Sequence, residues 1–348
     1  MKLSSCIDII SGGTPDTKNE LYWNGNIPWI SIKDFNNNRY IYSTEKSITE
    51  VGLKNSSTNL LDKNDIIISA RGTVGCLSQL TKTMAFNQSC YGIRSNKNEL
   101  LQNYLYYWLV ANIYKFKKNV HGAVFDTITK DIFNTINIEI PPINIQQHII
   151  DIIGSIDDKI ENNNKIIEKT NILLVSKFKK IYNSANISSD LKDFIELRTG
   201  KKDANAYNEN GIYPFFTCSE NDSKINDYSF DEEAILIAGN GNMSVKFYKG
   251  KFDAYQRTYV IHPQKYVTYI YLFYKTFINE ISNGARGSVI KFLTKSMLED
   301  CDFKLCDNNI MEKFENDNYK LLMSILDIKN ENKKLEELKQ LYLKKFFG

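Results

Sequence analysis

Two short, continuous apolar runs stand out along the chain, each followed by a turn that contains glycine. Ile66 to Ile68 precede the sequence RGTVG, and Ile235 to Ile237 precede GNGNM. An apolar run of this length that ends at glycine is typical of a strand buried on both faces. The two runs begin 169 residues apart. This spacing predicts that one structural unit occurs twice.

Further landmarks recur in the same order at offsets of 162 to 169 residues. FNQSCYGI from Phe86 has a counterpart in FDAYQRTYVI from Phe252, and the aromatic stretch from Tyr104 has one at Tyr269. HGA from His121 matches NGA from Asn283, and the ITK that ends at Lys130 matches the LTK that ends at Lys295. We therefore predict a mixed α/β fold of two similar domains related by a pseudo-twofold repeat, each with short strands followed by a long helix.

The two predicted long helices carry side chains at alternating spacings of four and three residues, the pattern of a coiled-coil seam. The first seam comprises Ile149, Ile153, Ile156, Ile160, Asn163, Ile167, Thr170 and Leu174, and the second includes Leu321, Ile325, Ile328, Asn332 and Leu335, continued less regularly by Leu338, Tyr342 and Phe346. A polar seam residue lowers stability but sets register and partner choice. Because Asn163 and Asn332 are equivalent, we predict that the two helices pair, antiparallel, within one chain. For one copy alone, an ordinary bundle helix is the commoner interpretation.

The predicted domains follow from these landmarks. They are a first domain over residues 1–144, a spacer helix over 145–187, a second domain over 188–308 and a second spacer helix over 309–348. A helix from Gln146 to Tyr182 is about 55 Å long at 1.5 Å per residue, against about 34 Å between successive turns of B-DNA. Such a pair of helices would place the domains at opposite ends of a rod, over two grooves of one duplex.

Composition narrows the class of protein. Of the 348 residues 42% are hydrophobic and 24% charged, which is typical of a globular protein and argues against wholesale disorder. The net charge of +3 permits nucleic-acid binding without requiring it. The six cysteines are scattered, which predicts reduced thiols in the cytoplasm. No apolar run reaches the length of a membrane span, and MKLSSCIDIISGG is too short and too polar for a signal peptide.

The chain resembles the specificity (S) subunit of type I restriction-modification enzymes over essentially its whole length. The matching stretches are SGGTP, IPWISIKDF, IIISARGTVG, FNQSCYGI, TITKDIF and, most specifically, IEIPPINIQQHIIDIIGSIDDKIENN from Ile138. The second half keeps the glycine turn, NGARGSVIKFLTK and the terminal helix, but has CDFKLCDNN where the Pro-Pro and Gln-Gln would stand. We interpret it as a diverged copy of the first half.

The resemblance implies two target-recognition domains that each read half of a split DNA sequence, with the paired helices as a spacer. It also implies a chain with no catalytic activity of its own. The expected partners are double-stranded DNA, methyltransferase (M) subunits, two in number, and restriction (R) subunits, with no membrane. S-adenosylmethionine, ATP and Mg²⁺ are expected on those partner subunits, and no cofactor or metal on this chain.

The residues themselves also argue against catalysis on this chain. Its one Pro-Pro pair, Pro141-Pro142, lacks the amide or acid and the aromatic residue that an amino-methyltransferase needs to hold a flipped base. GNGNMS resembles a dinucleotide loop, but it lacks the third glycine and is followed by a strand-like sequence. The three histidines are not spaced as metal ligands. The aromatic stretch from Tyr104 favours a buried helix, and Gln146 and Gln147 suit either a partner contact or a first helical turn.

Candidate DNA contacts are polar residues in the repeated loops, because matching positions of a duplicated reader are expected to share a role. In the first domain these are Arg71, Thr73, Gln88, Thr129 and Lys130. In the second domain they are Asn240, Asn242, Gln256, Arg257, Arg286, Ser288 and Lys295. For each single residue, a role in stabilising a turn or capping an element is an equal alternative.

We therefore predict a non-catalytic DNA-sequence reader that also acts as an assembly scaffold. The rival class is a protein–protein adaptor whose helices oligomerise and whose domains have no DNA specificity. A stand-alone nuclease is a third class, but no acidic metal site is visible in the sequence.

Overall fold

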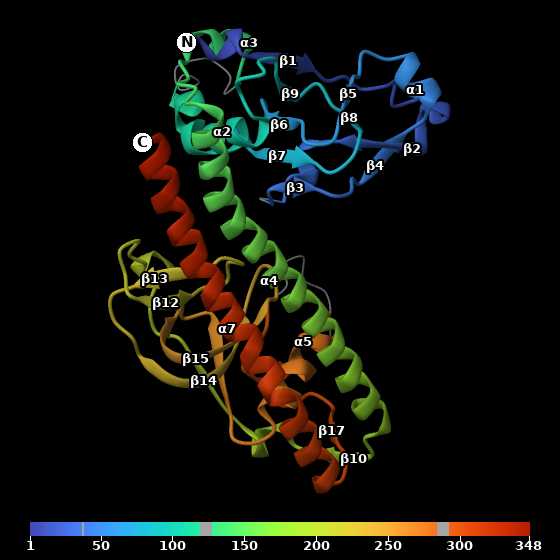
Figure 1. Cartoon of the computed structure of the whole chain (residues 1–348). Coiled ribbons are helices and arrows are strands. Elements are labelled where there is room, and N and C mark those ends of the chain that lie inside the picture. The colour runs from blue at the N-terminus through green and yellow to red at the C-terminus, as the bar shows by residue number, and fades with distance from the viewer. Residues whose placement is uncertain (37, 119–126, 284–291) are drawn as a thin grey trace. The chain divides into compact units, whose positions relative to one another are not determined.

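The protein is described by a computed structural model that covers residues 1–36, 38–118, 127–283 and 292–348 (Figure 1). It forms two compact units, one of residues 1–161 with 333–348 and the other of residues 162–332. The boundary crosses two long helices, α4 (Ile143–Ser184) and α7 (Asn308–Phe347), so each helix contributes to both units. The fold is mixed α/β, as predicted. The predicted domain limits are not tested by this division and stay a prediction.

The described part of the first unit contains a five-stranded sheet of order β1-β9-β6-β7-β3 and a four-stranded sheet of order β4-β2-β8-β5. Its strands are β1 (Ile7–Ser11), β2 (Trp23–Ile30), β3 (Tyr40–Ile41), β4 (Lys46–Ile48), β5 (Leu60–Leu61), β6 (Ile66–Ser69), β7 (Leu77–Leu80), β8 (Met84–Phe86) and β9 (Cys90–Ser95). Its helices, apart from α4 and α7, are α1 (Glu50–Lys54), α2 (Gln102–Lys118) and α3 (Lys130–Thr135), with 3-10 turns at Leu3–Ser5, Glu20–Tyr22 and Ile32–Asp34.

The described part of the second unit contains a six-stranded sheet of order β11-β16-β14-β15-β12-β13 and a two-stranded sheet of β10 and β17. Its strands are β10 (Ile187–Ser189), β11 (Ile195–Thr199), β12 (Tyr213–Phe216), β13 (Ser223–Ile225), β14 (Phe230–Ala238), β15 (Val245–Ala254), β16 (Thr258–Pro263) and β17 (Phe303–Leu305). Its further helices are α5 (Val267–Asn283) and α6 (Lys295–Glu299), with 3-10 turns at Leu191–Asp193 and Ala204–Ala206.

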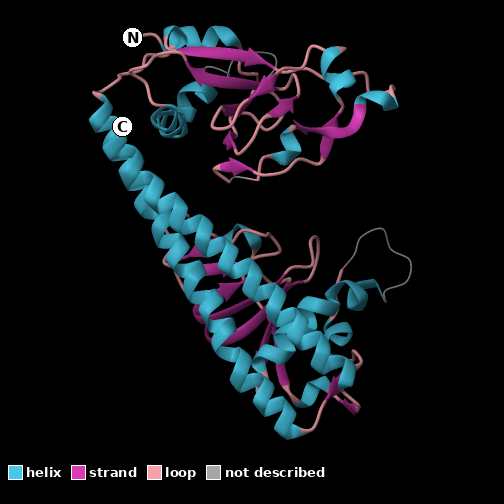
Figure 2. Cartoon of the chain, turned by 45° about the vertical axis from the view of Figure 1, so that its right-hand side comes forward, coloured by secondary structure: helices cyan, strands magenta, loops and turns pink. Residues whose placement is uncertain are grey.

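The two apolar runs form the central strands β6 and β14, and both are buried on their two faces. Ile66 and Ile68 pack with α2, α3 and the start of α4, whereas Ile67 packs on the opposite side with residues of β8 and β2. In the second unit, Ile235 and Ile237 pack with α4, α5 and α7, and Leu236 packs on the other side. Figure 2 shows helices beside the strands of this sheet. Side chains alternate along a strand, so a continuous apolar run supplies both cores.

The N-terminal part of each long helix is tied to the start of the aromatic helix in the same unit. Gln146 is fully buried: its Oε1 accepts the Leu101 N–H at 2.9 Å, and its Nε2 donates to the carbonyl oxygens of Glu99 and Pro141 at 2.5 and 2.8 Å. The carboxylate of Glu315 on α7 accepts the N–H groups of Thr268 and Tyr269 at the start of α5. Gln146 therefore has a structural contact within its own unit, as Glu315 does.

The long helices run antiparallel where they meet. In the first unit, Lys339 on α7 forms an ion pair with Asp157 on α4 at 2.7 Å. In the second unit, the Asn163 Nδ2 donates to the Asn332 Oδ1 at 2.8 Å, and the Lys177 Nζ donates to the Asn318 Oδ1 at 3.0 Å. The sequence number therefore rises along α4 while it falls along α7. Over the ranges that the structure describes, no helix is both long and apolar enough to cross a membrane.

Candidate nucleic-acid interface

Three segments of the first unit meet where β6 ends: the β6–β7 turn (residues 70–76), the β8–β9 turn (residues 87–89) and residues 127–129 before α3. The Ala70 N–H donates to the Ser89 carbonyl oxygen at 2.7 Å, and the Ala70 carbonyl oxygen accepts the Ile128 N–H at 2.9 Å. A single residue therefore joins all three segments. We call these segments the first loop cluster.

The second unit repeats this arrangement at the end of β14. The Gly239 N–H donates to the Arg257 carbonyl oxygen at 2.8 Å, and the Gly239 carbonyl oxygen accepts the Leu293 N–H at 2.9 Å. A further bridge joins Asn240 to Phe292. Residues 239–244, 255–257 and 292–294 thus form a second loop cluster with the same backbone connections as the first.

Buried backbone contacts set the shape of the turns and leave their polar side chains at the surface. The Ser69 Oγ donates to the Thr73 carbonyl oxygen and accepts the Cys76 N–H at 2.8 Å. Gly72 and Gly75 have φ of 73° and 85°, and Gly241 in the second cluster has φ of 71°. This left-handed region favours glycine because a Cβ is crowded there. Backbone conformation and buried hydrogen bonds therefore fix the shape of these turns.

A second close approach also recurs in both units. A Cβ on Gly12 would lie 2.1 Å from the Asn87 carbonyl oxygen, and a Cβ on Gly200 would lie 2.0 Å from the Ala254 carbonyl oxygen. Gly12 follows β1, and Gly200 follows β11. No side chain fits at either position, so the segments after β1 and β11 lie directly against the loops that follow β8 and β15.

The structure brings the predicted residues of the first domain to this surface. All five side chains are exposed: Arg71, Thr73, Gln88, Thr129 and Lys130. Arg71 and Thr73 lie in the first turn, Gln88 lies in the second, and Thr129 and Lys130 lie at the start of α3. The Thr14 hydroxyl donates to the Gln88 Oε1. Their contact with DNA is untested and stays a prediction.

The predicted residues of the second domain are placed similarly. Asn240 is half-buried, and Asn242, Gln256, Arg257 and Lys295 are exposed. The Asn242 Nδ2 donates to Glu220 at 3.0 Å, the Gln256 Nε2 donates to Asp203 at 3.2 Å, and Lys295 forms an ion pair with Glu299 at 3.4 Å. Arg286 and Ser288 lie outside the described residues.

Sequence reasoning missed a fourth segment at the second loop cluster, residues 217–222. The Lys246 Nζ donates to the carbonyl oxygens of Ser219 and Glu220 at 3.0 and 2.7 Å, and to the Asp222 carboxylate at 2.8 Å. This segment has no match among the repeated landmarks, so a comparison of the two halves did not select it. Thr14 was missed too, although it lies within SGGTP, one of the stretches that carry the family resemblance. Carboxylates such as Glu220 can accept a hydrogen bond from the amino group of cytosine.

The predicted seam residues lie along α4 and α7. Seven of them are buried: Ile149, Ile153, Ile156, Ile160, Asn163, Leu174 and Ile325. Four are half-buried: Ile167, Ile328, Asn332 and Leu335. Beyond Leu335 the inner face of α7 differs from the expectation, because Leu338 is 40% exposed and the ion-paired residue is Lys339. Four residues after Leu335 is the next step of the seam, so the helix turns Lys339 inward and Leu338 outward.

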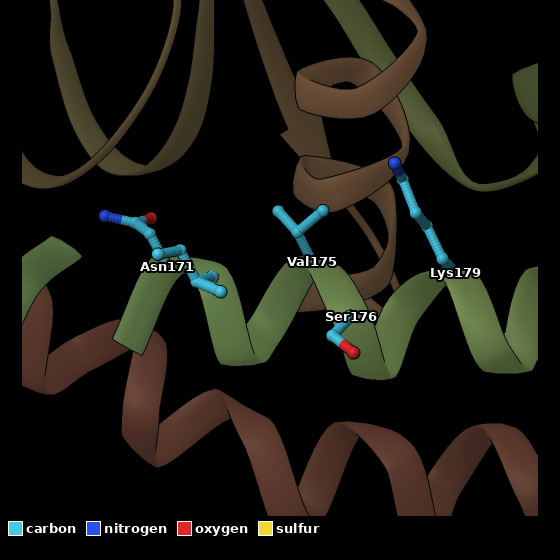
Figure 3. A pocket seen from close by; sticks show the side chains of 5 residues that line it. Asn171, Val175, Ser176 and Lys179 are labelled. Carbon is cyan, nitrogen blue, oxygen red and sulfur yellow. The ribbon is translucent and has the colours of Figure 1, made fainter. Parts of the chain in front are cut away.

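An open pocket of about 450 Å³ lies on α4, lined by Asn171, Ile172, Val175, Ser176 and Lys179. Figure 3 shows Asn171, Val175 and Lys179 pointing to one side of the helix. The Asn171 Oδ1 accepts a hydrogen bond from the Lys275 Nζ at 2.6 Å, and burial lowers the pKa of Lys275. None of the predicted DNA contacts that the structure describes lines this pocket.

The environment of the cysteines and the described acidic side chains bears on thiol and metal chemistry. All six cysteines lie in the described part of the chain, and none of them is in a disulfide. Burial raises the pKa of Cys90 to about 12 and that of Cys301 to about 11, which keeps these thiols protonated. Among the described residues, no group of three or more His, Cys, Asp or Glu side chains is arranged to hold a metal ion.

Known proteins are similar to this chain in sequence and in fold. Residues 1–171 and 186–340 match the family model of the type I restriction modification DNA specificity domain. Over 117 residues the chain is 47% identical to the type I restriction enzyme EcoDI specificity subunit of Escherichia coli, a match that covers 33% of this chain and 26% of that protein. The MjaIX specificity subunit of Methanocaldococcus jannaschii is 26% identical over 364 residues, which cover 90% of this chain and 84% of that protein. The S subunit of a type I restriction-modification system from M. genitalium has the same fold, with a TM-score of 0.65 and 16% identity over 100% of this chain and 95% of that one.

Proposed function

The chain belongs to the type I restriction-modification DNA specificity family and has a role in DNA target recognition, and we propose that each of its two domains reads one half of a bipartite target. The observation that carries this proposal is the pair of loop clusters. Ala70 and Gly239 make the same two backbone hydrogen bonds to corresponding segments. Two loop clusters with similar backbones and different exposed side chains are suited to reading two different half-sequences.

The side chains on these loop clusters suit the task. Arg71 and Arg257 can bind guanine edges or phosphates, and Gln88, Gln256 and Asn242 carry amides that can pair with adenine. Polar residues differ between the clusters while the backbone contacts persist. We therefore propose that the exposed side chains recognise the bases and that the shared backbone contacts position these side chains.

The helix pair is proposed to act as the spacer that fixes the gap between the half-sites. Helix α4 contains 42 residues and α7 contains 40. At 1.5 Å per residue, a helix of 42 residues is about 63 Å long, almost two turns of B-DNA. Such helices keep their length far better than a flexible linker would.

The chemistry would reside on partner chains. An adenine must be flipped out of the duplex before it can be modified, and two methyltransferase subunits bound to this chain would supply that pocket. S-adenosylmethionine would bind those subunits, and ATP and Mg²⁺ would bind the restriction subunits. This chain would then recognise the DNA sequence, set the gap between the half-sites and bind the partner subunits, but it would supply no catalytic group.

Matched arginine variants test the half-site assignment. The chain and its cognate methyltransferase are mixed with a DNA library randomised in both half-sites, and the methylated adenines are sequenced. We expect Arg71→Ala to relax selection in one half-site only and Arg257→Ala to relax it in the other half-site only. A lost bidentate contact to guanine lowers discrimination by about 5- to 150-fold, equivalent to about 1–3 kcal/mol.

Each outcome has a clear reading. Uniform weakening at every sequence would assign the arginine to phosphates instead of bases. Relaxation of both half-sites by one substitution would contradict the assignment of one domain to each half. A wild-type chain with no sequence-selective binding would favour a protein–protein adaptor.

A further inference from the structure

A polar cluster interrupts the apolar seam of α4 and α7 in the first unit. The Lys339 Nζ lies 2.7 Å from the Asp157 Oδ1, and the two side chains are only 15% and 5% exposed. The Tyr107 hydroxyl on α2 donates to the Asp157 Oδ2 at 3.0 Å. The buried apolar residues Ile153 and Ile160 lie on the same face of α4. We call Asp157, Lys339 and Tyr107, with the neighbouring Arg39 and Asp158, the Asp157 cluster.

The cluster also ties the strand layer to the helices. Arg39, just before β3, donates to the Asp158 Oδ1 at 2.9 Å and to the Tyr40 hydroxyl at 2.6 Å. Its guanidinium carbon lies 4.6 Å from the centre of the Tyr40 ring and 5.9 Å from that of Tyr107. Burial raises the pKa of Tyr107, and the Asp157 carboxylate raises it further, so the phenol stays protonated as a donor. Segments from β3, α2, α4 and α7 therefore meet at one group of side chains.

Stability alone does not explain this cluster. Desolvating an ammonium and a carboxylate costs about as much as their attraction returns, and apolar side chains of similar volume are often neutral or stabilising replacements. A polar residue in an otherwise apolar seam instead penalises every pairing in which it lacks its partner. The contribution expected from Asp157 and Lys339 is therefore specificity of pairing.

A second polar contact between α4 and α7, between Asn163 and Asn332, fits the same helix register as the contact between Asp157 and Lys339. The Asn163 Nδ2 donates to the Asn332 Oδ1 at 2.8 Å and to Glu331 at 2.7 Å. From Asp157 to Asn163 is six residues on α4, and from Lys339 back to Asn332 is seven residues on α7. Both contacts are satisfied in one register, and a slip of one helical turn would leave Asp157 buried without Lys339.

We propose that Asp157 and Lys339 are positioning residues: they fix the register of α7 against α4 and, through Tyr107 and Arg39, the seat of the first domain on these helices. They thereby restrict the gap at which the two half-sites are read, without contacting DNA. This inference rests on the proposed function and extends it from the reading of half-sites to the choice of gap.

The test uses the full chain with its methyltransferase and a DNA library in which the half-sites are constant and the gap varies by single base pairs. The double variant Asp157→Asn/Lys339→Met removes the ion pair, keeps an acceptor for Tyr107 and leaves no buried charge unpaired. We expect its preference for the wild-type gap over neighbouring gaps to fall at least about tenfold, while methylation at the best gap is retained.

Three comparisons complete the design. Asp151→Asn/Lys344→Met makes the same charge changes at exposed positions of the same helices and should keep the wild-type gap preference. Lys339→Arg retains the ion pair and should therefore also keep the wild-type gap preference. Arg39→Met removes the ion pair with the exposed Asp158 and the hydrogen bond to the Tyr40 hydroxyl but leaves no buried charge unpaired. It should keep the fold and broaden the gap range even if the double variant is unstable.

The outcomes separate this inference from the proposed function. A wild-type chain that methylates without any preferred gap would overturn the spacer function itself. A wild-type chain with one preferred gap, joined by folded cluster variants with the same preference, would overturn the positioning role alone. A uniform loss of methylation at all gaps in the cluster variants, with no change in preference, would also overturn it and indicate a purely structural role.

Discussion

At the scale of single residues, equivalent positions of the two units solve the same packing problem with different chemistry. Gln146 and Glu315 both accept hydrogen bonds from backbone N–H groups at the start of an aromatic helix. Backbone N–H groups at a helix start have no partner within the helix and need one when buried. An amide and a carboxylate can both accept these hydrogen bonds, but only the carboxylate can be charged.

Gln146→Leu should lower the free energy of unfolding by about 3 kcal/mol, because it leaves the Leu101 N–H and two carbonyl oxygens without partners. Its neighbour Gln147 is exposed, and its Nε2 donates to the Asp151 carboxylate at 2.7 Å. Gln147→Leu, as the control, should change that free energy by less than about 0.5 kcal/mol. Urea denaturation followed by circular dichroism measures both, and equal effects would show that the buried contacts are unimportant.

Glu315 predicts a pH dependence of stability. Burial raises its pKa in the folded chain above the unfolded value, even though Thr268 and Tyr269 donate hydrogen bonds to it. Folding therefore favours the protonated form, and this contribution to stability is fully present below the unfolded pKa and lost as pH rises through the folded pKa. Glu315→Gln should remove this part of the slope in unfolding free energy against pH. Glu312→Gln, at an exposed site, should retain it.

At the scale of elements, the long helices are stabilised by their shared apolar face. Ile156 and Ile160 are 7% and 8% exposed, whereas Ile166 and Ile172 on α4 are 48% and 63% exposed. In proteins most of the stability of a helix comes from the packing of its apolar face, so the order of α4 and α7 depends on this contact. The two faces of one helix therefore differ sharply in their tolerance of charge.

Ile156→Asp/Ile160→Asp should lower the free energy of unfolding by about 4 kcal/mol or more, because carboxylates replace buried apolar side chains. The same variant should assemble poorly with methyltransferase subunits, as judged by size-exclusion chromatography. Ile166→Asp/Ile172→Asp is the matched control for stability and should shift the unfolding free energy by less than about 1 kcal/mol. Similar losses in the two variants would contradict the assignment of the seam.

At the scale of the whole molecule, the spacer proposal makes the gap a property of helix length. Seven residues inserted after Glu161 and seven after Asn332 preserve the seam pattern and add about 10 Å to each helix, or about three base pairs of B-DNA. We expect the methylated gap to lengthen by this amount with both half-sequences unchanged. A heptad inserted into α4 alone should abolish methylation, because the helices lose their common register. An unchanged gap in the double insertion would refute the spacer.

Much of this arrangement was accessible from local patterns. The apolar runs predicted β6 and β14, and the glycine turns after them predicted loops, because strand burial and turn conformation depend on neighbouring residues. Lys246 and residues 217–222, which it contacts, were missed because they are not among the sequence landmarks that recur in both halves. The inward position of Lys339 was also missed, because a charged residue in a seam reads as a surface residue until its partner is known.

The sequence by itself therefore determined the duplication, the mixed α/β class and the paired character of the long helices. Each of these features follows from the spacing of apolar residues or from landmarks that recur at a nearly constant distance along the chain. Only the tertiary structure decided which distant segments share a site. Ala70 joins residues 89 and 128, Gln146 joins residues 99 and 101, and Asp157 joins Tyr107 and Lys339. These contacts depend on sheet pairing and helix register, which bring together residues that no local pattern relates.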